Sequence, residues 1–180
     1  MNDKQLAALV MAQIKPAMQA TSGLSGVKLA RNFQSRIHGA NSSPYLYFVK
    51  IGDHRYGHPE RKDVFDTQAN AFTHTEIQQY ESTYQFSAWI PQDPKDVTGL
   101  TESDILNTVS GIIQSDSILA AFRAQEVGIL RVTDVRNPYI VDDHDQFEAV
   151  PSFDVILTHK RTSVSTIPAV AAYDLNMSRV

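Results

Sequence analysis

The sequence contains no cysteine. Disulfide bonds and metal sites built on thiolates are therefore excluded, although this absence does not identify the compartment. No stretch approaches the roughly 18 consecutive apolar residues that a membrane-spanning helix needs. The amino-terminal residues also lack the basic-then-apolar order of a secretion signal. These absences predict a soluble, cytosolic chain.

An excess of positive charge is also missing. The chain has 16 Lys and Arg against 20 Asp and Glu, a formal net charge of −4, which argues against phosphate-driven binding to nucleic acid. Its hydrophobic content of 42% and charged content of 20% are ordinary for a globular protein. A chain of 180 residues suits one domain that buries roughly 70% of its unfolded surface.

The common catalytic motifs are missing too. There is no glycine-rich phosphate loop, no GxSxG elbow and no HExxH helix. His54 and His58 have the spacing of a metal site on a helix, but Pro59 argues against a helix there. A nuclease-like pairing of Asp154 with Lys160 would join two residues about 20 Å apart on one strand. The chain is therefore predicted to be non-enzymatic, with no cofactor and no metal.

The stretch around which the chain is organised runs from Val127 to Arg161, and it is typical of two long β-strands with a polar connection. Pro151 has no backbone N–H and predicts a bulge or an outward-facing edge position. Burying one large apolar side chain contributes about 1.5–3 kcal/mol, so this pair is expected to hold much of the core. The apolar face of the second strand alternates as Phe147, Ala149, Phe153, Val155 and Leu157.

The connection between these strands is acidic, with Asp142, Asp143, His144 and Asp145 in succession. A solvated loop is the favoured interpretation, because adjacent carboxylates point in different directions and no second cluster matches them. The alternative is a metal-dependent hydrolase or nuclease that uses these residues as ligands. The calcium-loop pattern does not fit, because its glycine and its final glutamate are both missing.

Helical periodicity occurs at the start and in the middle of the chain. Leu6, Val10 and Ile14 recur every four residues and predict an amphipathic helix that begins near Asn2 or Asp3 and that Pro16 ends or kinks. In the middle, Thr101 is predicted to cap a second helix, and Ser115 or Asp116 a short third one that runs to Gln125. The apolar stripe of the second helix is Ile105, Leu106, Val109, Ile112 and Ile113.

Strand patterns fill most of the remainder. Val27–Arg36 alternates in part, Tyr45–Ile51 is predicted to be a central strand, and His74–Ile90 has the clearest alternation in the sequence. This last strand has few charges, so it is predicted to be open to pairing with another chain at a subunit contact. Residues 52–73 lack clear periodicity and are predicted to form a loop that projects and touches a neighbour.

The pattern dissolves after Arg161. Residues 163–180 are apolar without being periodic, and two interpretations stay open: an arm that docks on a partner, or a frayed end. Residues 1–161 are thus predicted to form one α+β domain and residues 162–180 a C-terminal arm. The domain is expected to be a mainly antiparallel β-sheet with the N-terminal helix and the two central helices packed on it.

Several segments together resemble the neck or tail-terminator proteins of tailed bacteriophages. They are the amphipathic N-terminal helix and the segments SSPYLYFVKIG, QQYESTYQFSAWIPQD, DILNTVSGIIQS and VRNPYIVDDHDQFEAVPSFDVILTHKR. The resemblance rests on the pattern and order of these segments and covers most of residues 1–161. It implies a tail-terminator-like fold that assembles as a homohexameric ring in the virion after synthesis in the host cytoplasm.

This resemblance implies a structural role at the phage neck. The ring would terminate the tail tube and join it to the head–tail connector protein, with a tail sheath as a further candidate partner. DNA would cross the lumen without specific binding, and no membrane would be involved. A head-completion or stopper ring at the same neck is the alternative structural role.

Under this interpretation the candidate functional residues are interfacial. Arg31 and Glu81 could form an ion pair in the ring, and Trp89 could be core or an interface anchor. Arg136 and Tyr139 flank Asn137-Pro138 beside the acidic run. The full set of predicted interface residues is Arg31, Glu81, Trp89, Arg136, Tyr139, Asp142, Asp143, Asp145 and Tyr173.

Overall fold

The fold is α+β, as predicted. The computed structural model describes residues 1–31, 43–91, 99–141, 147–149 and 151–169, and within 139–141 and 147–149 it describes the backbone. A five-stranded sheet has the order β1-β2-β3-β7-β4, and a separate two-stranded sheet joins β5 to β6. All pairings are antiparallel except the parallel pair β1–β2.

The bounds of these elements follow the chain order. The helices are α1 (Asp3–Ala20), α2 (Glu102–Ile113) and α3 (Asp116–Arg123). The strands of the large sheet are β1 (Lys28–Arg31), β2 (Tyr45–Asp66), β3 (Ala71–Trp89), β4 (Gly128–Val132) and β7 (Ser152–Pro168). The strands of the small sheet are β5 (Tyr139–Val141) and β6 (Phe147–Ala149).

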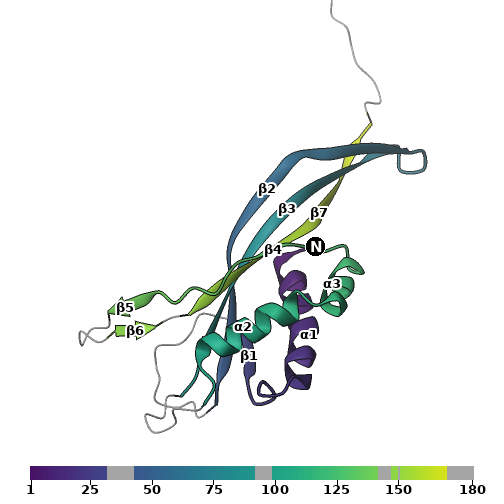
Figure 1. The fold of residues 1–180 in the computed structure, drawn as a ribbon. Coiled ribbons are helices and arrows are strands. Elements are labelled where there is room, and N and C mark those ends of the chain that lie inside the picture. Colours follow the sequence, from purple (N-terminus) through teal and green to yellow (C-terminus); the bar gives the residue numbers. More distant parts are fainter. Residues whose placement is uncertain (32–42, 92–98, 142–146, 150, 170–180) are drawn as a thin grey trace, which may run out of the picture.

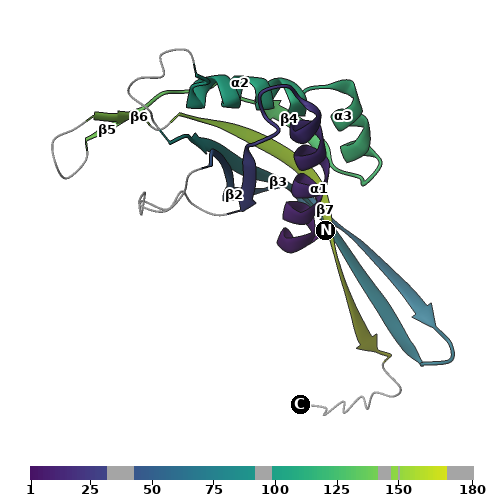
Figure 2. The same ribbon diagram turned by 90° about the horizontal axis from the view of Figure 1, so that it is seen from below.

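All three helices lie on the same face of the large sheet, as Figures 1 and 2 show from two directions. The core forms between them and the sheet, because the helices turn one apolar stripe toward it. The stripe of α1 is Leu6, Val10, Ile14 and Met18, and each of these side chains is buried. The sheet contributes Phe48, Tyr84, Phe86, Phe153, Val155 and Leu157. The stacked rings of Phe48, Phe86 and Phe153 cross three neighbouring strands.

The predicted helix caps are confirmed. The Asn2 side chain accepts a hydrogen bond from the Gln5 N–H, and Thr101 and Asp104 form a reciprocal capping box at the start of α2. Ser115 occupies the N-cap position of α3 without a side-chain capping hydrogen bond, and α3 ends at Arg123, before the predicted Gln125. The expectation for Pro16 was an end or a kink, and α1 in fact continues to Ala20. The last turns are retained because Met18, beyond the proline, is buried in the core.

The pairing of β4 with β7 confirms the strand pair predicted within Val127–Arg161. The predicted second strand, however, is divided between β6 and β7, which belong to different sheets. Pro151 lies at this division, directly before β7, so the predicted bulge or outward-facing edge position is wrong. A residue without a backbone N–H can stand where the chain leaves one ladder and enters another.

The loop predicted for residues 52–73 is wrong, because most of this stretch is strand. β2 runs to Asp66 and β3 begins at Ala71, so the two form one long hairpin. The residues that suggested a loop lie at an irregularity, where the register shifts between Tyr56 and Glu60 and Gly57 has φ of +67°. Pro59 lies in this irregular stretch of β2, past the part of the strand that β1 covers.

β3 is central, whereas its sparse charge predicted an edge that pairs with another chain. It bonds to β2 on one side and to β7 on the other along most of its length, so the prediction that β3 is open to pairing with a strand of another chain is wrong, while a subunit contact through its side chains remains a prediction. Its predicted alternation is confirmed, since Ser82, Tyr84, Phe86 and Ala88 are buried. The strand has few charges because it is the middle strand of the sheet.

Three strands extend well past the helices and form a twisted arm (Figures 1 and 2). We call this arm the ribbon: residues 51–66 of β2, 71–80 of β3 and 159–168 of β7. Residues 163–168, which lacked periodicity in the sequence, therefore continue β7, and only residues 170–180 of the predicted arm lie outside the described residues. The ribbon does project, as predicted for residues 52–73, while the predicted contact with a neighbour remains a prediction.

Within the described residues, no single helix is both long and apolar enough to cross a membrane. Only α2 and α3 taken together, bent by 57° at their junction, reach that length and composition.

Candidate functional site

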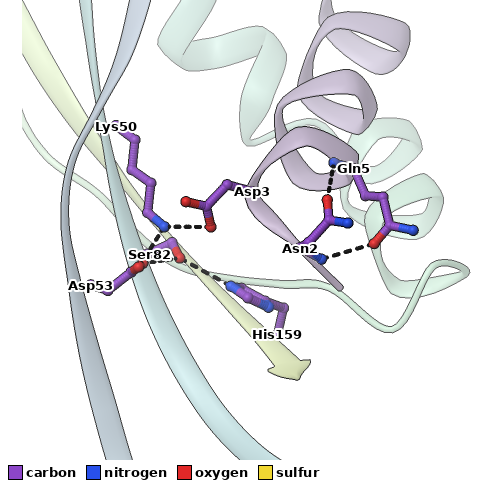
Figure 3. Close-up of polar contacts among 7 residues, drawn as sticks. All are labelled: Asn2, Asp3, Gln5, Lys50, Asp53, Ser82 and His159. Carbon is purple, nitrogen blue, oxygen red and sulfur yellow. Dashed lines mark hydrogen bonds and ion pairs between the residues drawn. The ribbon is translucent and has the colours of Figure 1, made fainter. Parts of the chain in front are cut away.

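A chain of polar side chains ties the base of the ribbon to α1, and Figure 3 shows it. Lys50 and Asp53 come from β2, Ser82 from β3, His159 from β7 and Asp3 from the first turn of α1. These positions share the helix-covered face of the sheet, because Asp53 is opposite Ser82 and Ser82 follows the alternation of buried residues along β3.

Hydrogen bonds connect all five of these side chains. Lys50 Nζ donates to Asp3 Oδ1 at 2.8 Å and to Asp53 Oδ2 at 2.5 Å. Ser82 Oγ donates to Asp53 Oδ1 at 2.5 Å and lies 3.0 Å from His159 Nε2. Ser82 is 0% exposed and His159 is 5% exposed, so the contact between these two side chains is shielded from water.

The protonation states follow from these partners. Burial alone would raise the pKa of Asp53, but hydrogen bonds from Lys50 and Ser82 outweigh it, so the pKa lies below its ordinary value. Burial would lower the pKa of Lys50, and the two carboxylates more than reverse this and raise it. Burial, together with the nearby N-terminal ammonium, lowers the pKa of His159. The pair Lys50–Asp53 is thus charged and His159 is neutral at pH 7.

These protonation states determine which residue donates and which accepts in each hydrogen bond. An ionised Asp53 can only accept hydrogen bonds, so the Ser82 hydroxyl is the donor in its hydrogen bond with Asp53, and the neutral His159 donates its Nε2–H to Ser82 Oγ. A nucleophilic serine requires the opposite direction of this hydrogen bond, because the imidazole must accept the serine proton. It also requires access to a substrate. Ser82 is instead fully buried, and the cluster holds three strands and a helix in register at the base of the ribbon.

The outer part of the ribbon also has cross-strand contacts on this face. Arg61 bonds to Glu76 at 2.9 Å, and Asp63 lies 2.5 Å from His74 Nδ1. At the tip, Phe65 and Phe72 have ring centroids 5.0 Å apart. These phenylalanines and Ile167 are 44%, 39% and 45% exposed, respectively, so apolar area remains in water at the end of the ribbon.

An open depression of about 580 Å³ lies beside the polar cluster. Its walls come from the start of α1, the turn between α3 and β4, and β7. His159 lines it, and its Nδ1 is buried without a hydrogen-bond partner among the described residues. Glu126, in the turn, has φ of +57°, a conformation that is uncommon for residues other than glycine.

Two of the predicted interface residues have contacts within the chain. Arg136 Nη2 bonds to Asp154 Oδ2 at 2.6 Å, and its backbone bridges Ser152, so it fixes the start of β7. Trp89 is half-buried at the end of β3, opposite Tyr45.

Arg31 and Glu81 are not brought together within one chain. Arg31 ends β1 beside Phe48, whereas Glu81 is half-buried farther along β3, opposite His54 and Thr158. Their pairing between subunits therefore remains a prediction.

The acidic connection cannot be assessed in the same way. Asp142, Asp143, His144 and Asp145 lie outside the described residues, as does Tyr173, and Tyr139 is placed by its backbone as the first residue of β5. Among the residues that are described, no group of three or more His, Asp or Glu side chains is arranged to hold a metal ion.

Sequence reasoning missed the cluster of Lys50, Asp53, Ser82 and His159. One signal was available: Ser82 occupies an apolar position in the alternation of β3, and His159 continues the odd-numbered apolar positions of β7. A hydroxyl and an imidazole on two buried faces need partners. The cross-strand register that brings them together could not be read from either strand alone.

One family model matches the chain over residues 5–169, and its description is E217 gateway protein gp29. No curated protein matches the chain. The matched residues include α1 from Gln5 onward, α2, α3, the complete large sheet and the ribbon. The chain therefore belongs to the E217 gateway protein gp29 family, a family of phage structural proteins, and is a virion-associated, neck-related protein that interacts with other phage structural components.

Proposed function

We propose that this protein forms a ring at the phage neck that terminates the tail tube and joins it to the head–tail connector. The observation that carries the proposal is the ribbon, which extends from a helix-covered core with apolar area exposed at its tip. Such a projection contributes little to the core of its own chain, so its role is expected in contacts with other chains. Membership in a family of phage gateway proteins supports a position at the neck.

The role is structural, without catalysis, cofactor or metal. In the arrangement of Ser82, His159 and Asp53, the serine donates to the ionised carboxylate and accepts from the imidazole, as in a structural hydrogen-bond network. DNA crosses the lumen of the ring without specific binding, in keeping with the net charge of −4, because an acidic or neutral surface does not retain phosphates.

The test combines assembly state and partner identity. Native mass spectrometry of the full-length protein is expected to give a homohexamer, or a monomer that becomes a hexamer when isolated tail tubes are added. Electron microscopy of those tubes should then show density on one end. Binding to filled heads without any binding to tubes would instead favour the head-completion or stopper role, and a stoichiometric bound metal would favour the hydrolase.

A further inference from the structure

Among the described residues, the two edges of the ribbon are unpaired over most of their length. β1 covers only Tyr45–Phe48 of β2, and β4 covers only the part of β7 from Val155 to Thr158. Within the part of the chain that the structure describes, no strand pairs with the outer side of residues 60–66 on β2 or of residues 162–168 on β7. Each edge therefore presents a row of free backbone N–H and C=O groups.

The β7 edge is unusual in its composition. Residues 162–168 read TSVSTIP, without a charged side chain, and hydroxyls and β-branched residues predominate. Free edges in monomeric proteins are commonly protected by lysines, bulges or covering segments, which prevent another chain from pairing there. Residues 162–167 lack charges, bulges and proline, since the register with β3 is continuous from Ser152 and the proline of this edge, Pro168, is the last residue of β7. This edge is suited to accept a strand.

The direction of the strands selects which edge can meet it. β2 and β7 are both antiparallel to β3 and are therefore parallel to each other. When copies of the chain stand side by side in the same orientation, the β2 edge of one copy faces the β7 edge of the next as a parallel pair. This contact joins two different edges, so it repeats from copy to copy and closes into a ring if the rotation permits.

The two edges match in chemistry at the tip of the ribbon only, because residues 60–66 of β2 read ERKDVFD and carry five charged side chains, whereas residues 162–168 of β7 carry none. Phe65, Phe72 and Ile167 form one cross-strand row, so the row is apolar at both of its ends. Joining two ribbons at the same level places Ile167 of one copy beside Phe65 of the next. The exposed apolar area at the ribbon tip is then covered and becomes a continuous apolar band.

We infer that residues 60–66 on β2 of one copy pair in parallel with residues 162–168 on β7 of a second copy, so that the ribbons join into one continuous wall. The inference rests on the proposed ring, because it names the surface through which neighbouring copies meet. The occupant of each edge is thus a second copy of this chain.

Cysteine pairs test this seam directly, because the natural chain has no cysteine. Lys62 and Val164 are exposed and lie in one row on either side of Thr75. Within one chain they are two strand spacings apart, about 9.6 Å, beyond the roughly 7 Å that a disulfide can span. A disulfide between Lys62→Cys and Val164→Cys must therefore join two copies. Thr162→Cys and Thr166→Cys, each with Lys62→Cys, allow for a stagger between neighbours.

Under mild oxidation we expect one of the three double variants to run mainly as covalent multimers on a non-reducing gel, while each single variant remains monomeric. Lys62→Cys with Leu130→Cys is the matched control, because Leu130 is about as exposed as Val164, at 57% against 63%, but lies on β4 away from the ribbon. If the purified chain stays monomeric, the same variants are oxidised in assembled virions.

The outcomes separate the seam from the ring. Hexamers in native mass spectrometry without a crosslink in any of the three double variants would overturn the seam and leave the proposed function intact. Covalent dimers of Lys62→Cys alone would also overturn the seam, because two β2 edges would then meet about a two-fold axis. Crosslinked multimers that never close into a ring would support the seam and contradict the ring. The absence of both crosslinks and rings, in solution and in virions, would contradict both.

Discussion

At the scale of single residues, Ser82 connects the charged pair Lys50–Asp53 to the neutral His159 in the polar cluster. It donates to Asp53 and accepts from His159, and both contacts are lost in Ser82→Ala. Because Ser82 and His159 are buried, the variant leaves the His159 Nε2–H without a partner, which should destabilise the fold by about 1–3 kcal/mol. The midpoint of urea unfolding measures this. Ser87→Ala, on the opposite face of β3, should stay within about 0.5 kcal/mol of the parent chain, and equal effects of the two variants would contradict the assigned role.

His159 should make the stability depend on pH. Its folded-state pKa lies below the unfolded value of about 6.5, so the unfolded chain binds more protons between these two values. Stability is therefore expected to fall as the pH drops through about 6.5 toward the folded-state pKa. His159→Gln retains an amide donor and should remove this decline. Asp53 has a lowered pKa in the folded state, so its titration changes the stability only below its unfolded pKa of about 3.9, outside this pH range. Parallel pH profiles of the two proteins in urea unfolding would count against the assignment.

At the scale of elements, the junction of β4 with β7 depends on Gly128. It is paired with Thr158, and a Cβ at position 128 would overlap Thr158 Oγ1. Gly128→Ala should therefore cost about 1–3 kcal/mol, and Thr158→Ala in the same background should restore most of that stability. A double-mutant cycle by urea unfolding measures the coupling. Additive effects would mean that the Thr158 side chain simply rotates away.

Local periodicity identified the elements whose own residues decide their structure. The capping signal at Thr101 and the alternation of β3 both depend on short-range rules, and both are confirmed. The outer half of β2 could not be recognised, because Gly57 and Pro59 are loop residues by local rules and the strand exists through its pairing with β3. For the same reason residues 163–168 gave no signal. A ribbon exposed on both faces has no buried side to impose alternation.

The candidate site was predictable only in part for a similar reason. The sequence places polar residues at apolar positions of β3 and β7, yet Asp53 and Lys50 belong to a strand whose register is irregular. Lys50 reaches Asp53 and Asp3 only because α1 begins beside that irregularity, and the distance of 2.8 Å between Lys50 and Asp3 is a product of the tertiary fold. Contacts between residues 47 positions apart are not encoded in any local pattern.

At the scale of the whole molecule, the core and the ribbon have separate tasks. The helices and the inner sheet hold nearly all of the buried apolar side chains, whereas the ribbon has apolar residues that the chain itself does not cover. Stability should therefore be determined by the core, and assembly by the ribbon. The polar cluster at the base of the ribbon connects its three strands to one another and to α1 (Figure 3).

This division predicts that the double variant Phe65→Thr, Phe72→Thr separates folding from assembly. Threonine keeps a strong preference for strands, but the two rings are 44% and 39% exposed and contact each other, so the isolated chain should lose about 1–3 kcal/mol in urea unfolding and remain folded. The fraction of chain in the hexamer, followed by native mass spectrometry at fixed concentration, should fall at least about tenfold if the tip contact contributes about 1.4 kcal/mol to each association step. Val64→Thr is the control, because Val64 is similarly exposed but lies on the opposite face of the ribbon. Unchanged hexamer formation in the double variant would show that the apolar tip serves a contact other than the one between neighbouring copies.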